Sequence, residues 1–434
     1  MAASTTLRMA IAFSSVRIPS LAVPSLAALE SFSSTIRGRL HTSLVMIDFH
    51  LIEKGPGKKL INEKPLLEWR IAMTTAFVGV PCQIQALRKT QELVGDFKDT
   101  VSIGLFCREN WSFSCMRALV EDDYGVKMES IDRFDIKKGK LKLFHGDSVT
   151  DIPLAKTHPY VRINCQICLD FSAELADVSV GAVGTPKGWS TVIVRTKKGA
   201  ELVDGAAAKG YIEVKDIGEV KPGVGIIKRL SKEKREENLA EARRREEKGI
   251  KVPHIYSMND ESFDAFVEYA KGKQFAELEY IVIDTGACVS CGACAAVCPV
   301  DIIKFDDYRP VKVGEEKEGC NLCYLACPRT AMPIPAIEKT IDFAGDDRDE
   351  QLGRYVKILA GRAVSDKIEG QDGGVVTALL AYALDTGEVE RVVTVKQGER
   401  AWEPDTAIVR DSKELLDTAG TIYSMAVTME GLRE

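Results

Sequence analysis

The sequence has no long hydrophobic run, and its positive charges do not outnumber its negative ones. No stretch of the 434 residues approaches about 18 apolar residues without a charge or a proline, which argues against a transmembrane helix. The 58 lysines and arginines face 64 aspartates and glutamates, giving a net charge of −6, whereas a general nucleic-acid binder is normally basic. We therefore expect neither a membrane-spanning segment nor a nucleic-acid partner.

Acidic residues are also scarce in the first 45 residues, where Glu30 is the only one. The same segment is rich in serine and contains four arginines: Arg8, Arg17, Arg37 and Arg39. Such a composition is typical of an organellar transit peptide, and an unstructured extension is the alternative. We expect residues 1–45 to be such an extension and residues 46–72 to be a linker. The expected location is cytoplasmic, or organellar if the transit peptide is genuine.

Cysteine, in contrast, is concentrated in one region. Seven of the 12 cysteines fall between Cys288 and Cys327, which indicates metal ligation and a reducing compartment rather than a disulfide framework. The length suggests about three domains. A hydrophobic content of 45% and a charged content of 28% are ordinary for a globular protein.

Short apolar runs alternate with helical patterns in residues 73–255. Strands are predicted at residues 74–80, 101–106, 177–183 and 191–195, and helices at residues 84–93 and 113–124. This alternation indicates an α/β sheet. The highly charged segment 227–248 is predicted to be a solvated surface helix, with partner binding through Arg243–Arg245 as the alternative.

The second half of the chain divides into three segments. Residues 256–283 are expected to be a connector with a short helix, and residues 284–335 form a cysteine-rich module. Residues 350–434 are again expected to be α/β, with a helix at 373–387, a strand at 389–396 and a helix at 412–418 that has Asp411 as its N-cap.

The first motif of the module has the spacing C-x2-C-x2-C-x3-C followed by proline. Its cysteines are Cys288, Cys291, Cys294 and Cys298. Thiolates are preferred ligands of iron–sulfur clusters, and a tight loop with this spacing presents three of them to one 4Fe–4S cluster. The fourth usually serves the other cluster of a two-cluster ferredoxin. A structural zinc site is the alternative.

The second motif is one cysteine short. It contains Cys320, Cys323 and Cys327, and Lys317 stands where the pattern expects a fourth cysteine. Crossed ligation would give the first cluster Cys327 in addition to three cysteines of the first motif.

The second cluster would then be held by only three thiolates, from Cys298, Cys320 and Cys323. Three thiolates fit a 3Fe–4S cluster, or a 4Fe–4S cluster with an oxygen ligand. Glu316 or Glu318 could supply that oxygen.

Four further cysteines have suggestive positions. Cys82 and Cys107 lie at the carboxyl ends of two predicted strands, the edge where α/β sheets place their sites. Cys165 and Cys168 form a C-x2-C pair in a polar loop and could reach one metal ion or cluster. Buried structural cysteines and a zinc site are the alternatives. Cys115 is assigned to the core.

Several long motifs outside the module are distinctive. They are Phe77–Lys89 (FVGVPCQIQALRK), Gly104–Asn110 (GLFCREN), Cys165–Thr196 (CQICLDFSAELADVSVGAVGTPKGWSTVIVRT), Gly370–Gly387 (GQDGGVVTALLAYALDTG) and Ala419–Ser424 (AGTIYS). In these motifs the chain resembles the coenzyme F420 hydrogenase/dehydrogenase β-subunit family.

The resemblance implies an α/β flavin domain, with a mixed sheet and flanking helices, next to a small α+β ferredoxin-like module. It assigns one 4Fe–4S cluster beside FAD to four cysteines: Cys82, Cys107, Cys165 and Cys168. Two or three clusters are then expected in total. It also implies hydride exchange between coenzyme F420 and FAD, followed by single-electron transfer through the clusters, with no catalytic side chain.

Nine residues are candidates for the flavin or deazaflavin site. Gly373 and Gly374 allow close backbone approach and precede a predicted helix whose N-terminal amides could face FAD phosphates. The weaker candidates are Thr377, Thr421, Tyr423 and Ser424, together with Gly184, Trp189 and Ser190.

The two halves of the family pattern stand in rotated order. Residues 73–255 resemble the C-terminal half and residues 350–434 the N-terminal half. If the halves dock within one chain, Glu434 should lie near the strand that begins at Thr74. The expected partner is a hydrogenase, a formate dehydrogenase, a ferredoxin or a reductase subunit. The alternatives are an enzyme like 7-hydroxymethyl chlorophyll reductase and a non-catalytic electron relay.

Overall fold

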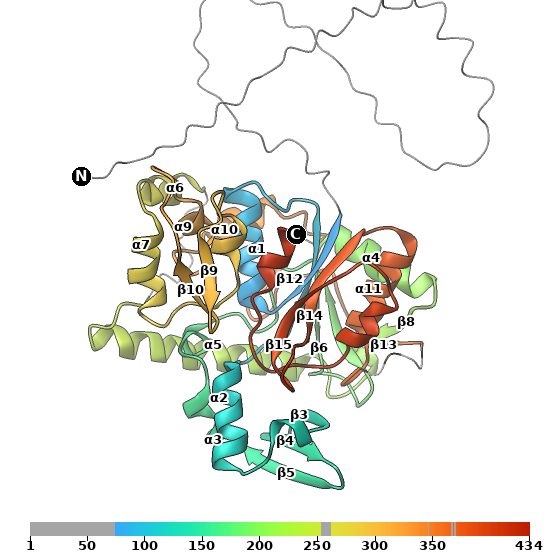
Figure 1. The fold of residues 1–434 in the computed structure, drawn as a ribbon. Coiled ribbons are helices and arrows are strands. Elements are labelled where there is room, and N and C mark those ends of the chain that lie inside the picture. The colour runs from blue at the N-terminus through green and yellow to red at the C-terminus, as the bar shows by residue number, and fades with distance from the viewer. Residues whose placement is uncertain (1–73, 253–261, 346, 366–367, 369) are drawn as a thin grey trace, which may run out of the picture. The chain divides into compact units, whose positions relative to one another are not determined.

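The computed structural model describes residues 74–252, 262–345, 347–365, 368 and 370–434, so the expected extension (1–45) and linker (46–72) lie outside the described residues. Eight strands within the described part form one mixed sheet (Figure 1). Their order across the sheet is β15 (Pro404–Val409), β14 (Arg391–Gln397), β1 (Thr75–Gly79), β2 (Thr100–Leu105), β6 (Val178–Gly181), β7 (Ser190–Val194), β13 (Lys357–Ala363) and β8 (Ile212–Asp216). The expected mixed α/β sheet is confirmed.

Segments from both ends of the described chain contribute to this sheet. β1 pairs in parallel with β2 on one side and with β14 on the other, where Thr75 is opposite Arg391 and Phe77 is opposite Val393. The four strands β14, β1, β2 and β6 are parallel, and the strands outside them pair antiparallel. The first and last α/β segments therefore complete a single sheet.

The last residues of the chain lie beside the start of β1. The Arg391 side chain donates from Nε to Thr75 Oγ1 and from Nη2 to the carbonyl oxygen of Leu432, each at 3.0 Å. One side chain thus links the beginning of β1 to the C-terminal turn Thr428–Leu432. This is the proximity expected if the rotated halves dock within one chain.

The two faces of the sheet carry different coverings (Figure 1). Helices α4 (Lys197–Ala208) and α11 (Val375–Thr386) pack on one face, and α1 (Pro81–Leu93) packs on the other with the cysteine-rich module. Strand β1 shows the alternation that produces this division, because Ala76 and Val78 join the first core whereas Phe77 joins the second.

The cysteine-rich module consists of short elements. Its elements are α8 (Ala293–Ala296), the hairpin β9 (Ile303–Asp306) and β10 (Arg309–Lys312), α9 (Leu322–Ala326) and α10 (Ile334–Thr340). The connector before it contains two short helices, α6 (Asp264–Ala270) and α7 (Phe275–Leu278), where the sequence suggested one.

The remaining elements lie outside the main sheet. An antiparallel sheet of β3 (Arg133–Lys137), β4 (Lys140–His145) and β5 (Ser148–Pro153) lies at the bottom of Figure 1 with α2 (Phe113–Arg117) and α3 (Leu154–Thr157). The strands β11 (Arg348–Asp349) and β12 (Gly353–Arg354) form a small hairpin, and α5 (Val224–Glu247) is a long helix beneath the module.

Two helical predictions were wrong in type. The segment after Asp411 is a 3₁₀ turn at Glu414–Thr418, although Asp411 Oδ1 still accepts a hydrogen bond from the Lys413 amide at 2.8 Å. The helix expected at 113–124 is α-helical only to Arg117 and then widens into π-type turns. In it Cys115 is half-buried, so its assignment to the core was also wrong.

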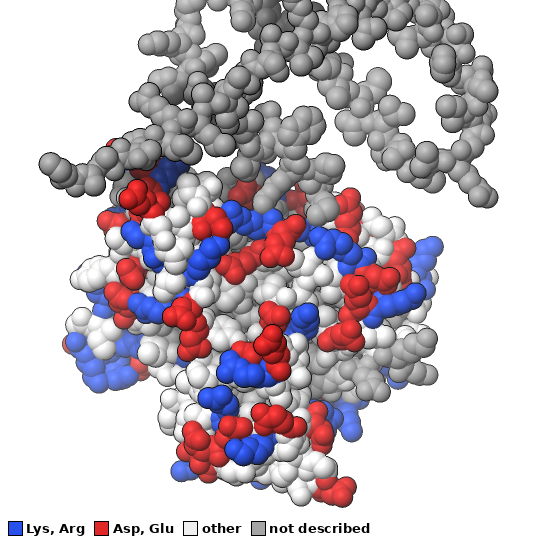
Figure 2. Space-filling model, viewed as in Figure 1, with Lys and Arg blue, Asp and Glu red and all other residues white. Residues whose placement is uncertain are grey.

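Charged side chains of both signs are interspersed on the face shown in Figure 2, without a continuous basic surface. None of the helices in the described ranges combines the length and the apolar character needed to cross a membrane.

Candidate functional site

Four cysteines from separate parts of the chain share one neighbourhood. Cys82 lies in the first turn of α1 and Cys107 follows β2, so both are at the carboxyl ends of adjacent parallel strands. Cys165 lies in the 3₁₀ turn Ile163–Ile167, and Cys168 directly follows it. Burial raises the pKa of Cys107, and the negative charges of the other three thiolates raise it further. The structure therefore brings all four sulfur atoms together.

Two buried cations accompany these thiols. Lys234 Nζ, on α5, donates to the carbonyl oxygens of Cys107 at 2.6 Å and Asp170 at 2.7 Å, and only 2% of the residue is exposed. Arg329 is 3% exposed, and its positive charge lies near the Cys168 thiol. Burial lowers the pKa of both cations, but the neighbouring thiolates outweigh it, so both pKa values are raised.

These features fit an anionic cluster in the four-cysteine site. Arg329 Nε and Nη2 have no hydrogen-bond partner in the described part of the chain, which is costly for a buried guanidinium unless an anion is bound nearby. A 4Fe–4S cluster with four thiolate ligands is such an anion. Across the described residues, no three His, Cys, Asp or Glu side chains are grouped to hold a single metal ion.

Helix α5 supports the loop that carries two of these cysteines. Asn238 Nδ2 donates to the carbonyl oxygens of Cys165 at 2.8 Å and Cys168 at 2.6 Å. Arg245, at 8% exposure, donates to the carbonyl oxygen of Ile163 at 3.3 Å. The expectation of a solvated surface helix is therefore wrong for the inner face of α5. Of the run Arg243–Arg245, Arg244 and Arg245 both pair with Glu241, and Arg245 also contacts the cysteine loop.

The first site of the cysteine-rich module is formed from both of its motifs. Burial raises the pKa of Cys294, and the thiolates of Cys291, Cys288 and Cys327, followed by that of Cys323, raise it further. The sulfur of Cys327 thus lies with three sulfurs of the first motif, which is the ligand set that crossed ligation requires. Burial also raises the pKa of Cys327, to about 11.

A fully buried lysine lies against this first site. Lys89 Nζ donates to the carbonyl oxygen of Cys327 and to Thr330 Oγ1, both at 2.7 Å, and stands 4.1 Å from the centre of the Phe266 ring. Burial lowers the pKa of Lys89 to about 7, although the Cys327 thiolate opposes the shift. Lys89 therefore ties α1 to the second cysteine motif.

The C-terminal segment packs closely on the first motif, and this contact requires a glycine. Gly292 has φ +90°, and a Cβ at this position would lie 2.8 Å from Val427 Cγ1 and 3.1 Å from the Glu430 amide nitrogen. The Met429 amide donates to the carbonyl oxygen of Cys291 at 2.9 Å. A residue with a side chain would push the C-terminal turn away from the cysteine loop.

The three remaining cysteines of the module line a cavity, which is the second cysteine site of the module. Its polar lining consists of Cys298, Cys320, Cys323, Glu316 and Lys317. Burial raises the pKa of Cys323 to about 12, and the charges of Cys320, Cys327 and Glu316 contribute. Glu316 is thus a neighbour of these thiols, and the other carboxylate suggested by the sequence, Glu318, is exposed and does not line the cavity.

Four of the flavin candidates lie around the loop that precedes α11. The Gly373 amide donates to Ser190 Oγ at 3.1 Å, and Gly374, with φ +65°, begins α11. On the other side, Gln371 Nε2 donates to Tyr423 Oη at 2.8 Å. The loop at residues 370–374 therefore lies between Ser190 of β7 and Tyr423 of the C-terminal segment.

Two candidates in the loop before β7 have other contacts. The ring of Trp189 lies 4.6 Å from Lys215 Nζ and 4.8 Å from the Arg362 guanidinium carbon. Gly184 faces α5, because a Cβ there would lie 2.7 Å from Ile227 Cδ1. Gly184 therefore serves packing.

The last three candidates are less closely grouped. Thr377 is buried within α11, Ser424 forms a β-bridge with Trp111, and Thr421 is exposed. The structure does not unite all nine flavin candidates around one cavity.

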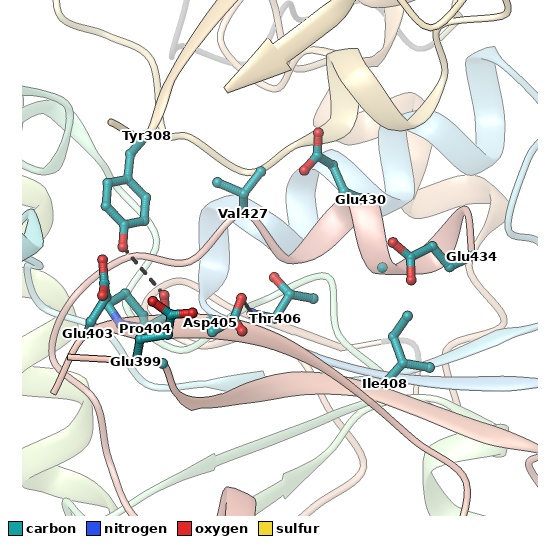
Figure 3. A pocket seen from close by; sticks show the side chains of 12 residues that line it. Tyr308, Glu399, Glu403, Pro404, Asp405, Thr406, Ile408, Val427, Glu430 and Glu434 are labelled. Atoms are coloured by element: carbon teal, nitrogen blue, oxygen red, sulfur yellow. Dashed lines mark hydrogen bonds between the residues drawn. The ribbon is translucent and has the colours of Figure 1, made fainter. Parts of the chain in front are cut away.

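A cavity of about 560 Å³ lies between the β9–β10 hairpin and the C-terminal turn (Figure 3). Five carboxylates line it, from Glu399, Glu403, Asp405, Glu430 and Glu434. Tyr308 closes one side and donates from Oη to the carbonyl oxygen of Pro404 at 3.4 Å. The cavity contains none of the candidate cysteines and none of the flavin candidates, so we assign it no cofactor.

Comparisons with known proteins identify the α/β domain. The family model for the C terminus of the coenzyme F420 hydrogenase/dehydrogenase beta subunit matches residues 72–220, and the model for the N-terminal part of the same protein matches residues 358–433. The β subunit of coenzyme F420 hydrogenase from Methanosarcina barkeri is 37% identical over 207 residues, covering 44% of this chain and 71% of that protein. The chain belongs to the coenzyme F420 hydrogenase/dehydrogenase β-subunit family.

For other relatives, the match covers a smaller share of the relative's length. The coenzyme F420 hydrogenase β subunits of Methanococcus voltae and Methanothermobacter thermautotrophicus are 42% and 41% identical, over 41% of this chain and 65% of each relative. The chain thus spans just under two thirds of these two proteins. A chain of the F420-reducing NiFe hydrogenase complex from M. barkeri is 40% identical, and the match covers 39% of this chain and 60% of that chain with a TM-score of 0.38.

The family models also confirm two features read from the sequence. The C-terminal model precedes the N-terminal model along this family member, so the order is rotated. A 4Fe–4S binding domain model matches residues 281–304, which contain the first cysteine motif.

Sequence reasoning missed three residues around the cysteine sites, which are Lys234, Asn238 and Arg329. Lys234 and Asn238 lie in a segment whose lysines, arginines and glutamates are mostly solvent-facing, so no local signal marked them. Arg329 directly follows a Cys-Pro pair of the second motif, and that position was the only available signal.

Proposed function

We propose that this chain is an FAD- and iron–sulfur-dependent oxidoreductase subunit that exchanges hydride with coenzyme F420 and passes single electrons to or from a partner protein. The proposal rests on family membership and on one structural observation. Two buried cations, Lys234 and Arg329, accompany four converging cysteines in a domain that also carries a ferredoxin-like module.

The contact between the two cysteine sites supports electron transfer between them. The Cys82 thiolate contributes to the raised pKa of Cys291, which belongs to the first site of the module. The Arg329 amide donates to Cys327 Sγ at 3.4 Å, while its side chain reaches Cys168. Clusters held at these two sites would be neighbours with a shared buried cation.

The loop before α11 supports the flavin part of the proposal. The first amides of α11 have no partners within the helix, and the N-terminus of a helix of this length favours the phosphates of a dinucleotide. Burial raises the pKa of Tyr423 to about 12, so its hydroxyl stays protonated at neutral pH and can donate a hydrogen bond. FAD, when bound, converts between hydride transfer and single-electron transfer.

Coenzyme F420 enters the proposal through the relatives, whose names contain it. The chain's own residues would bind and orient the two cofactors, and no side chain needs to form a covalent bond. Trp189 presents an aromatic ring flanked by Lys215 and Arg362, which both pair with Glu213, and such a ring suits stacking on a planar coenzyme.

An anaerobic assay tests this function. The full chain, reconstituted with iron, sulfide and FAD, is mixed with reduced coenzyme F420 and a one-electron dye acceptor. We expect oxidation of the coenzyme to depend on both FAD and iron. Protein that retains FAD and iron but does not oxidise reduced coenzyme F420 would contradict the proposal, and protein that binds clusters but no FAD would identify an electron relay.

A further inference from the structure

The second cysteine site of the module has three thiols and one carboxylate. Cys298, Cys320 and Cys323 line the same cavity as Glu316. Lys317, at the position where the motif lacks its cysteine, also lines the cavity, but an ammonium group carries no lone pair and does not bind iron. The site therefore needs a fourth ligand from another residue if it holds a complete cubane.

Glu316 differs from its acidic neighbours in its contacts. Glu315 and Glu318 are exposed, whereas the Glu316 side chain is only 16% exposed. Glu316 Oε1 accepts a hydrogen bond from Lys312 Nζ at 2.9 Å. Its other oxygen, Oε2, has no hydrogen-bond or ion-pair partner among the residues that the structure describes.

The charge of Glu316 also reaches the site. It is one of the negative charges near Cys323, together with those of Cys320 and Cys327. A carboxylate with a free oxygen beside three thiols has the donor chemistry of an iron ligand.

We propose that Glu316 supplies the fourth ligand of the second cluster, which is then a 4Fe–4S cluster with one oxygen-ligated iron. The inference requires only that the module binds clusters, and it does not depend on flavin or on coenzyme F420. The oxygen-ligated iron is the most easily lost. Mild oxidation by ferricyanide takes one electron from the cluster and releases this iron as Fe²⁺, which leaves a 3Fe–4S cluster bound by the three cysteines.

Iron analysis and electron paramagnetic resonance of the full, anaerobically reconstituted chain test this ligand. We expect the unmodified protein to show no three-iron signal until ferricyanide is added, and then one such signal per chain with the loss of one iron. Glu316→Gln should show that signal before oxidation and contain one iron fewer. Glu318→Gln and Lys312→Met should behave like the unmodified protein, because they leave the Glu316 carboxylate in place.

A second variant separates ligand loss from loss of folding. Adding Lys317→Cys to Glu316→Gln restores a fourth thiolate and should restore the full iron content, with the first cluster of the module as an internal control for folding. The proposal is overturned if Glu316→Gln keeps the iron content and the oxidation response of the unmodified protein. It is equally overturned if Lys317→Cys does not rescue Glu316→Gln, or if the unmodified protein holds three irons at this site under all reducing conditions.

Discussion

The positive charge of Arg329 lies near the thiol of Cys168, although the two residues belong to different parts of the fold. Arg329 follows the second cysteine motif of the ferredoxin-like module, and Cys168 lies in the turn after the small three-stranded sheet. A buried positive charge at this boundary lowers the cost of placing two anionic clusters near each other. A change of buried charge beside the clusters is therefore expected to alter their properties.

Replacing Lys234 should change the reduction potential of the cluster at the four-cysteine site. Lys234→Gln removes a buried positive charge, so adding an electron becomes less favourable and the potential falls. The Coulomb energy is about 1–3 kcal/mol at an effective dielectric constant near 20, which is about 40–130 mV for one electron. A redox titration followed by electron paramagnetic resonance measures the shift.

The matched control lies two residues earlier on the same helix. Lys232 is exposed and pairs with Glu236 at 3.8 Å, so Lys232→Gln removes the same charge in contact with water. Its effect on the potential should be much smaller because solvent screens the charge. Equal shifts for the two variants would show that Lys234 does not lie beside the cluster.

Removing one of the four converging thiols should remove a single cluster. Cys82→Ala is expected to lose the iron and sulfide of the four-cysteine site, while the module keeps its own signals. Cys115→Ala, which alters a half-buried cysteine outside both motifs, should keep all of the iron. Iron analysis with electron paramagnetic resonance decides the matter, and full iron content in Cys82→Ala would refute the ligand assignment.

Asp177 stabilises the centre of the sheet through a buried ion pair. Its carboxylate accepts hydrogen bonds from the Ser102 amide and hydroxyl at 2.8 and 2.7 Å and lies 3.0 Å from Arg88 Nη2. Burial raises the pKa of Asp177, but Arg88 and Ser102 lower it more, so the pKa lies below its usual value. Asp177→Asn should lower the free energy of unfolding by about 3–5 kcal/mol at neutral pH, since Arg88 is left buried and unpaired.

This loss should depend on pH. A lowered pKa gives stability that is present above the unfolded value of about 3.9 and disappears as the pH falls through the folded value. The difference in the free energy of unfolding between Asp177→Asn and the unmodified protein should therefore become smaller below about pH 4, as measured by urea unfolding. Asp204→Asn, which breaks an exposed pair with Lys357, should change stability by less than about 0.5 kcal/mol. A difference in the free energy of unfolding that does not change with pH would contradict stabilisation by the Asp177 carboxylate.

Much of the site could be predicted from local sequence patterns. The motif spacing alone predicted that Cys327 lies with Cys288, Cys291 and Cys294, because a tight loop and crossed ligation constrain the geometry strongly. Five of the eight strands of the main sheet were predicted to within one or two residues at each end, since buried strands are short apolar runs, whereas β8, β13 and β15 were not predicted. The proximity of Cys82 and Cys107 followed from their positions after parallel strands.

The parts that could not be predicted depend on contacts between distant segments. Lys234 is buried because α5 crosses the cysteine loop, and nothing in its neighbouring residues distinguishes it from exposed lysines. The choice of Glu316 over Glu318 depends on which side chain turns toward the cavity. For the flavin candidates, Gly184 and Ser190 are only six residues apart, yet one packs against α5 and the other contacts the loop before α11.

The most direct test of the proposed function is a titration of the reconstituted full chain with reduced coenzyme F420, without dye or partner, followed by flavin absorbance and electron paramagnetic resonance. We predict that the coenzyme bleaches the flavin and that signals of reduced clusters then appear, from both the four-cysteine site and the module. Clusters that dithionite reduces but reduced coenzyme F420 does not, in protein that contains flavin, would contradict the account.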